Sequence, residues 1–124
     1  MPVIPRLTEP LFTTPNVSFT PLATPSRGDC QDVLVCNIDV TPGVRGATHQ
    51  VTRQQVYVAQ SGKAVAHVAD QQHEIEAGQV FLLEPGLDFA LEAVGDQPFT
   101  AVVCAAGDAE VVTANGRGTP PWAR

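Results

Sequence analysis

The sequence lacks most of the features that mark membrane, nucleic-acid-binding and disulfide-bonded proteins. Only 16% of its 124 residues are charged, and its seven Lys and Arg residues are scattered along a chain of net charge −6. Because no basic stripe could follow a phosphate backbone, nucleic acid is not expected as a partner. An anionic membrane surface is disfavoured for the same reason. No apolar run approaches the ~18–20 residues of a membrane-spanning helix.

Cysteine is scarce as well. The three cysteines, Cys30, Cys36 and Cys104, are odd in number, and their spacing is typical of neither a disulfide framework nor a zinc motif. Cys36 and Cys104 lie in apolar runs, which predicts buried, unreactive thiols, whereas the polar surroundings of Cys30 predict a more exposed one. The N-terminus lacks the basic start and apolar stretch of a secretory signal, so a cytoplasmic protein is expected.

The composition that is present predicts one globular domain. Apolar residues make up 44% of the chain, enough for a hydrophobic core at this length. Prolines are concentrated in residues 1–25 and exclude a helix there. We therefore expect residues 1–25 to form an extended arm of the same domain, with a strand at 16–22, and residues 26–124 to form a β-barrel.

The chain beyond the arm alternates short β-rich segments with turn signals. Strands are expected at 33–40, 48–51, 55–60, 64–69, 73–76, 79–83, 88–93, 99–105 and 110–113. Ser61-Gly62-Lys63 is expected to close a hairpin. Turns recur every 8–12 residues and no window sustains a helical period, which predicts an all-β sandwich or barrel with antiparallel pairing.

Two motifs between Pro42 and Ala105 resemble those of the cupin superfamily. The first motif of that family is a glycine, five residues, His-x-His, three or four residues, Glu, six residues and Gly. Here His49 stands at the first histidine and Gly62 at the closing glycine. Val51 replaces the second histidine and Gln55 replaces the glutamate.

The second motif of the family is a glycine, five residues, Pro-x-Gly, two residues and His. Gly78 and Gly86 match it, Glu84 replaces the proline, with Pro85 one place later, and Phe89 replaces the final histidine. The chain is also similar to small single-domain bacterial cupins that end in Pro-Pro-Trp. The resemblance implies a cupin-like jelly roll, or double-stranded β-helix, whose function lies inside the barrel.

The departures from these motifs bear on metal binding. A catalytic transition-metal site needs about three converging ligands, and valine and phenylalanine offer none. No cofactor is therefore expected; a divalent transition metal held by other residues is the disfavoured alternative. His67 can point inward or outward, His73 is expected to be exposed, and Glu84 is read as a turn residue rather than one facing the cavity.

The retained polar residues define a candidate site. Strand alternation places Gln55 and Tyr57 on one face, so if Gln55 points inward, as the family's glutamate does, Tyr57 does too. His49 and Tyr57 are the candidate catalytic residues. The candidate ligand-binding residues are Val51, Gln55, Phe89, Leu91 and Val103. A few polar groups in an apolar cavity are typical of a small-molecule site; in the alternative, His49, Gln55 and Tyr57 only satisfy one another in a filled core.

Three functions follow from these residues. The first is a metal-independent cupin that binds a small, largely apolar or aromatic organic molecule inside the barrel. The second is an isomerase, epimerase or cyclase that uses His49 and Tyr57 for proton transfer. The third is a metal-dependent oxygenase with a rebuilt ligand set.

A homodimer is expected as well. The arm carries apolar residues that are costly to leave in water, and Val56 and Val58 lie on the face opposite the proposed cavity and also need cover. An arm laid across a partner's sheet in a two-fold contact meets both needs, and the resemblance to cupins supports pairing. The alternative is an arm folded over its own barrel. The arm residues concerned are Phe12, Val17, Phe19 and Leu22.

Overall fold

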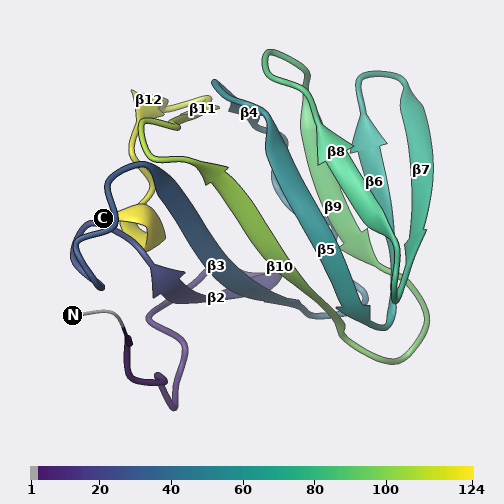
Figure 1. The fold of residues 1–124 in the computed structure, drawn as a ribbon. Coiled ribbons are helices and arrows are strands. Elements are labelled where there is room, and N and C mark those ends of the chain that lie inside the picture. The colour runs from purple at the N-terminus through teal and green to yellow at the C-terminus, as the bar shows by residue number, and fades with distance from the viewer. Residues whose placement is uncertain (1–2) are drawn as a thin grey trace.

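The computed structural model describes residues 3–124, which form short strands and a single turn of 3₁₀ helix near the C-terminus (Figure 1). The elements are β1 (Phe12–Thr13), β2 (Val17–Ala23), β3 (Val33–Val40), β4 (Gln50–Val51), β5 (Gln55–Ser61), β6 (Lys63–Val68), β7 (Gln71–Glu76), β8 (Val80–Leu83), β9 (Phe89–Ala93), β10 (Phe99–Ala106), β11 (Val111–Thr113), β12 (Gly116–Gly118) and η1 (Pro121–Ala123). The predicted all-β jelly roll is confirmed.

The strands form two main sheets and one small sheet. The larger sheet has the order β1-β2-β3-β10-β5-β8, and the second has the order β7-β6-β9. A small sheet, β12-β11-β4, lies at one end of the barrel (Figure 1). The paired strands are antiparallel throughout, as expected. Side chains from both main sheets, such as Tyr57 and Val103 from one and Ala66 and Leu91 from the other, share one core.

The expected hairpin at Ser61-Gly62-Lys63 is wrong. Strand β5 pairs with β10 and β8, whereas β6 pairs with β7 and β9, so the chain changes sheets at this turn. Gly62 has φ +76°, a left-handed conformation that favours glycine, and a Cβ atom there would collide with the carbonyl oxygen of Pro98. The glycine therefore allows a tight corner between the sheets, which a local turn signal cannot distinguish from a hairpin.

The proline-rich arm is built into the larger sheet of its own chain. Strand β2 pairs with β3 along most of its length, and β1 pairs with β2. Phe19 stacks on Trp122 with ring centroids 5.6 Å apart and lies 6.2 Å from Phe12. Val17 and Phe19 are packed against the core. These contacts cover apolar side chains of the arm within the chain.

The cysteine predictions hold only in part. Cys36 is fully buried and Cys30 is partly exposed, as expected, but Cys104 is only half-buried. Cys104 lies on the side of β10 that faces away from the core, because burial alternates along this strand. No helix within residues 3–124 is long and apolar enough to cross a membrane.

Candidate functional site

Strand β5 points three side chains into the barrel. Gln55, Tyr57 and Ala59 are buried and alternate with the half-buried Val56 and Val58, as the strand pattern predicted. The Tyr57 hydroxyl donates a hydrogen bond of 2.8 Å to Oε1 of Gln55. This bond pairs the Tyr57 hydroxyl with the amide oxygen of Gln55 in an otherwise apolar interior, where leaving either unpaired would be costly.

Apolar side chains surround this pair. The four predicted apolar ligand-binding residues are all buried and belong to the same core as Tyr57: Val51, Phe89, Leu91 and Val103. The rings of Tyr57 and Phe89 lie 5.8 Å apart. The structure thus brings the inward-facing candidates together, and side chains rather than open space occupy the interior.

Phe81 packs against Tyr57 and Phe89, although it was not among the residues predicted for the site. Its ring is 6.0 Å from that of Tyr57 and stacks on Phe89 at 6.2 Å. It lies directly opposite Tyr57 on β8, which is an edge strand of the larger sheet. Alternation along the predicted strand 79–83 would have placed Phe81 on the same face as the buried Leu83, so the signal was present.

Two histidines approach this cluster from outside the larger sheet. His49 is half-buried, and the edge of its ring meets Phe89 with centroids 5.4 Å apart. Its Nδ1 lies 3.2 Å from the carbonyl oxygen of Ala47. His73, on β7, is exposed as expected and lies 6.0 Å from Phe81. We call the five rings of His49, Tyr57, His73, Phe81 and Phe89 the aromatic cluster.

Burial decides what Tyr57 can do chemically. Desolvation, together with the nearby Cys36 thiol, raises the pKa of the Tyr57 phenol well above its ordinary value. The phenol therefore stays protonated near neutral pH and acts as a hydrogen-bond donor rather than as a base. Burial also raises the pKa of Cys36 to about 12, so its thiol is inert at neutral pH.

The residues at the cupin metal positions do not fit a metal ion. Val51 and Phe89 have no donor atoms, and the amide oxygen of Gln55 already accepts a hydrogen bond from Tyr57. His49 is then the remaining donor among the four positions, and one imidazole is too few. Within residues 3–124, no group of three or more His, Cys, Asp or Glu side chains could hold a metal ion.

The other singled-out polar residues lie away from the aromatic cluster. His67 lies 3.0 Å from Glu92 through Nε2 and faces away from the buried Ala64 and Ala66. Glu84 is exposed and accepts a hydrogen bond of 2.7 Å from Gln54. Both residues therefore have partners outside the barrel interior.

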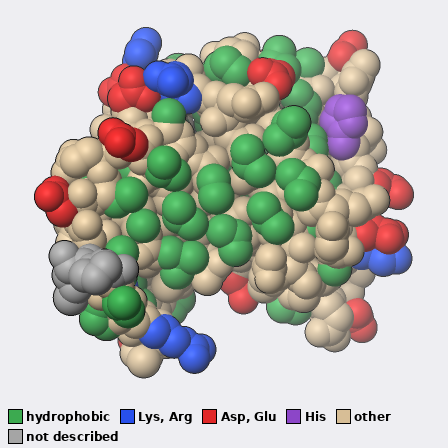
Figure 2. Space-filling view, in the orientation of Figure 1, with side chains coloured by type: hydrophobic (Ala, Val, Ile, Leu, Met, Phe, Trp, Pro, Cys, Tyr) green, Lys and Arg blue, Asp and Glu red, His purple; other side chains and the backbone are tan. Residues whose placement is uncertain are grey.

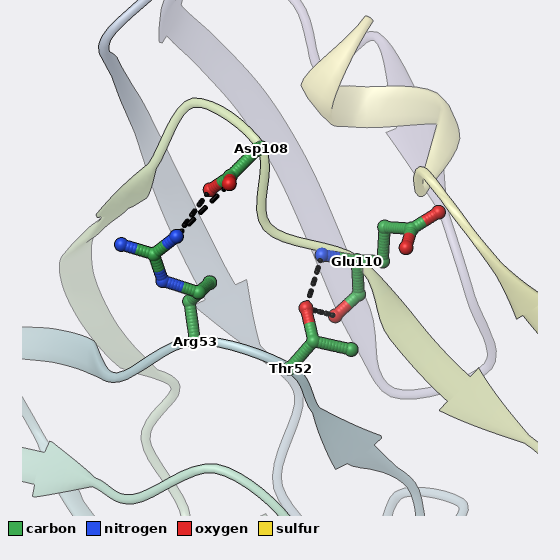
Figure 3. Close-up of polar contacts among 4 residues, drawn as sticks. All are labelled: Thr52, Arg53, Asp108 and Glu110. Atoms are coloured by element: carbon green, nitrogen blue, oxygen red, sulfur yellow. Dashed lines mark hydrogen bonds and ion pairs between the residues drawn. The ribbon is translucent and has the colours of Figure 1, made fainter.

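The turn between β4 and β5 is held by polar contacts shown in Figure 3. Arg53 makes an exposed ion pair of 2.9 Å with Asp108. The hydroxyl of Thr52 accepts a hydrogen bond of 2.9 Å from the backbone N–H of Glu110. These contacts tie the turn to the segment before β11. They thereby position Val51 and Gln55, which flank the turn.

A groove of about 380 Å³ lies elsewhere, on the outward side of the larger sheet. Most of its lining residues have polar side chains, and they come from strands β2, β3, β5 and β10, with Pro10 at the edge: Ser18, Thr20, Asn37, Asp39, Gln60 and Thr100, together with Ile38 and Ala101. The groove contains none of the residues predicted for the site.

Comparisons of sequence with known proteins find no relative: neither a family model nor a curated protein matches this chain. Solved structures do match. A cupin-like protein from Thermotoga maritima has a TM-score of 0.68 at 20% identity, over 78% of this chain and 76% of the other. A conserved protein with a double-stranded β-helix domain from Klebsiella pneumoniae has a TM-score of 0.65 at 23% identity, over 88% and 87%.

Longer chains match in part. A vicilin from Solanum melongena has a TM-score of 0.71 at 16% identity over 86% of this chain, which spans only about a third of the vicilin (32%). At identities this low, the matches show a shared fold alone.

Proposed function

We propose that this chain, a cupin by its fold, binds a small aromatic or largely apolar organic molecule in its barrel without a native metal. The observation that supports this most is the aromatic cluster, which runs from the exposed His73 and half-buried His49 to the buried Tyr57–Gln55 pair. Apolar walls with a few placed polar groups are typical of small-molecule sites. The Solanum melongena vicilin is described as holding different anionic ligands in structurally similar pockets, so this fold can enclose small molecules.

Because side chains fill the interior, a ligand must displace one of them. Phe81 is the best candidate, since it is only half-buried and lies on the edge strand β8. Rotating its ring outward would open a slot between Phe89 and Tyr57 of the size of one aromatic ring. A ligand in this slot would stack on Phe89 and reach the hydroxyl of Tyr57 and the imidazole of His49.

Proton transfer between His49 and Tyr57 has weaker support. The Tyr57 hydroxyl is engaged with Gln55, and its raised pKa opposes ionisation near neutral pH. His49 contacts Phe89 and the carbonyl of Ala47. An isomerase of this kind would lose its turnover in both His49→Gln and Tyr57→Phe while each variant keeps the native circular dichroism spectrum.

A rebuilt metal site has the least support. Protein purified without chelator is expected to carry far less than one transition metal ion per chain, measured by elemental analysis. Near-stoichiometric Fe, Mn, Ni or Zn that is lost on His49→Ala would overturn the metal-free part of the proposal.

Tyr57 offers a direct test of ligand binding because it is the only tyrosine of the chain. Protein with ring-¹³C tyrosine gives one set of tyrosine signals from inside the barrel. Titration with indole, phenol or benzoate is expected to shift these signals saturably. Trp122, the only tryptophan, stacks on Phe19 outside the aromatic cluster, so its indole signals serve as the internal control and should not move.

A pair of variants sharpens this titration. Phe81→Ala removes the ring that a ligand must displace, so it is expected to bind the same probe at least several-fold more tightly. The matched control is Phe12→Ala. It removes a ring that contacts Phe19 and lies on β1, the edge strand at the other end of the larger sheet from β8. Absence of any shift of the Tyr57 signals with all three probes in the Phe81→Ala variant would overturn the proposal.

A further inference from the structure

The outward side of the larger sheet carries a patch of apolar side chains across four neighbouring strands. Figure 2 has the same orientation as Figure 1. Apolar side chains gather in the middle of the face formed by β3, β10, β5 and β8, and the charged groups lie mostly at its edges. We call this patch the outer face. Its residues are Val33, Val35, Val56, Val58, Val80, Leu82, Val102, Cys104 and Ala106.

Strand register arranges the outer face in rows. One row across the four strands contains Val35, Cys104, Val56 and Leu82, and the next contains Asn37, Val102, Val58 and Val80. The exposed fractions are 58% for Val80, 53% for Leu82 and 44% for Val33. Large apolar side chains with this exposure are costly to leave in water.

We propose that a second copy of this chain packs on the outer face in a two-fold symmetric, sheet-on-sheet contact. The patch contains no Lys, Arg, Asp or Glu, so it demands no oppositely charged partner and is complementary to itself. A two-fold contact brings identical patches together and therefore requires this self-complementarity. Antiparallel sheets pack face to face through such apolar side chains at a distance of about 10 Å.

The outer face supplies roughly a third of the area that a standard interface buries on each partner. Four strands spaced by about 4.8 Å and rows spaced by about 7 Å give an apolar area on the order of 300 Å² per copy. A standard interface buries about 800 Å² per partner, with an apolar core and a polar rim. The polar groove that includes Asn37, Asp39 and Thr100 adjoins the patch and supplies such a rim on one side.

The arm contributes to the rim rather than to an exchange between copies. Strand β2 is paired with β3 of the same chain, and its outward side chains Ser18 and Thr20 line the polar groove. Phe19 is covered by Trp122 from the same chain. The interface therefore needs no swapped arm, and its apolar core comes from β3, β10, β5 and β8 alone.

Light scattering coupled to size exclusion tests the proposal. The chain of 13.1 kDa is expected to have twice that mass at micromolar concentration. Val58→Lys, which places a cation in the middle of the outer face, is expected to give monomers. The matched control is Val65→Lys, another half-buried strand valine, which lies on the outward side of β6 between Glu74 and Glu92 and should leave the dimer intact.

Two further measurements separate a lost interface from a lost fold. Val80→Lys changes a residue that is already 58% exposed, so it should keep the native circular dichroism spectrum while weakening the dimer. Cys104 should react slowly with a thiol reagent in the wild-type protein and at least tenfold faster in the folded monomeric variant. A monomeric wild-type mass, or a Val58→Lys protein that stays dimeric, would overturn the proposal.

Discussion

The two sides of strands β5 and β10 both carry apolar side chains but differ in their surroundings. Inward residues such as Tyr57 and Val103 are at most 6% exposed and are packed against the second sheet. Outward residues such as Val58 and Val102 are only half-buried, because no element of the described chain forms a layer over them. Hydrophobicity thus identifies strands with two apolar sides, but only the second layer shows which side forms the monomer core.

A charge on the inward side provides the most disruptive test of this comparison. Val51→Asp would bury an unpaired carboxylate at a position that is 2% exposed, and we expect a loss of about 3–5 kcal/mol in the free energy of unfolding. Val51→His should be better tolerated because imidazole is neutral above its pKa. Urea unfolding measures both values.

The control for this prediction carries the same charge on a less buried strand. Val112→Asp, on β11 opposite Arg117, should cost less than about 1 kcal/mol. If Val51→Asp melts within a degree or two of the parent, Val51 does not face the core and the inward register of the site is wrong.

Alkaline pH should lower the free energy of unfolding through two groups of the buried interior, Cys36 and Tyr57. Burial raises the pKa of Cys36 from 9.0 to about 12, and a raised pKa means that the folded state holds its proton more tightly than the unfolded chain. The resulting stability is fully present below pH 9 and is lost as pH rises toward 12. Tyr57 adds to the loss above pH 10 because its pKa is also raised.

Between pH 8 and pH 10.5 the contribution of Cys36 should lower the free energy of unfolding by about 2 kcal/mol. Urea unfolding at a series of pH values measures it. Cys36→Ala should show a clearly flatter decline, whereas Cys104→Ala, on the outward side, should follow the wild-type curve. Equal slopes for all three proteins would show that Cys36 is not shielded from water.

The sequence was sufficient for most of the fold and part of the site. Strand 33–40 is confirmed residue for residue, and alternation placed Gln55 and Tyr57 on the buried face. The exchange of sheets at Gly62 was not predicted, because a glycine turn looks the same whether the next strand pairs or crosses. Cys104 was misplaced because an apolar run does not show which of its two faces meets a second layer.

A smaller loss of stability is expected when the hydrogen bond between Tyr57 and Gln55 is removed. Tyr57→Phe leaves the amide oxygen of Gln55 without a donor, which should cost about 1–2 kcal/mol in the free energy of unfolding. Combining it with Gln55→Leu should recover part of this loss, since both polar groups are then removed. Strictly additive losses in the double-mutant cycle would contradict the pairing.

The smallest effect is expected at the surface. Arg53 and Asp108 form an ion pair with side chains that are 53% and 72% exposed, so Asp108→Ala should cost less than about 1 kcal/mol. A larger loss would mean that the turn between β4 and β5 depends on this pair more than its exposure indicates. High salt should reduce even this small difference.

Native mass spectrometry of freshly purified protein shows whether the barrel binds a small organic molecule without a metal. The chains are expected to have no metal-ion mass increment and to carry a small organic adduct, either co-purified or formed on incubation with indole, phenol or benzoate. The adduct should be retained more strongly by Phe81→Ala. A metal increment that disappears in His49→Ala would contradict the account, as would Phe81→Ala protein that forms no adduct with any of the three probes.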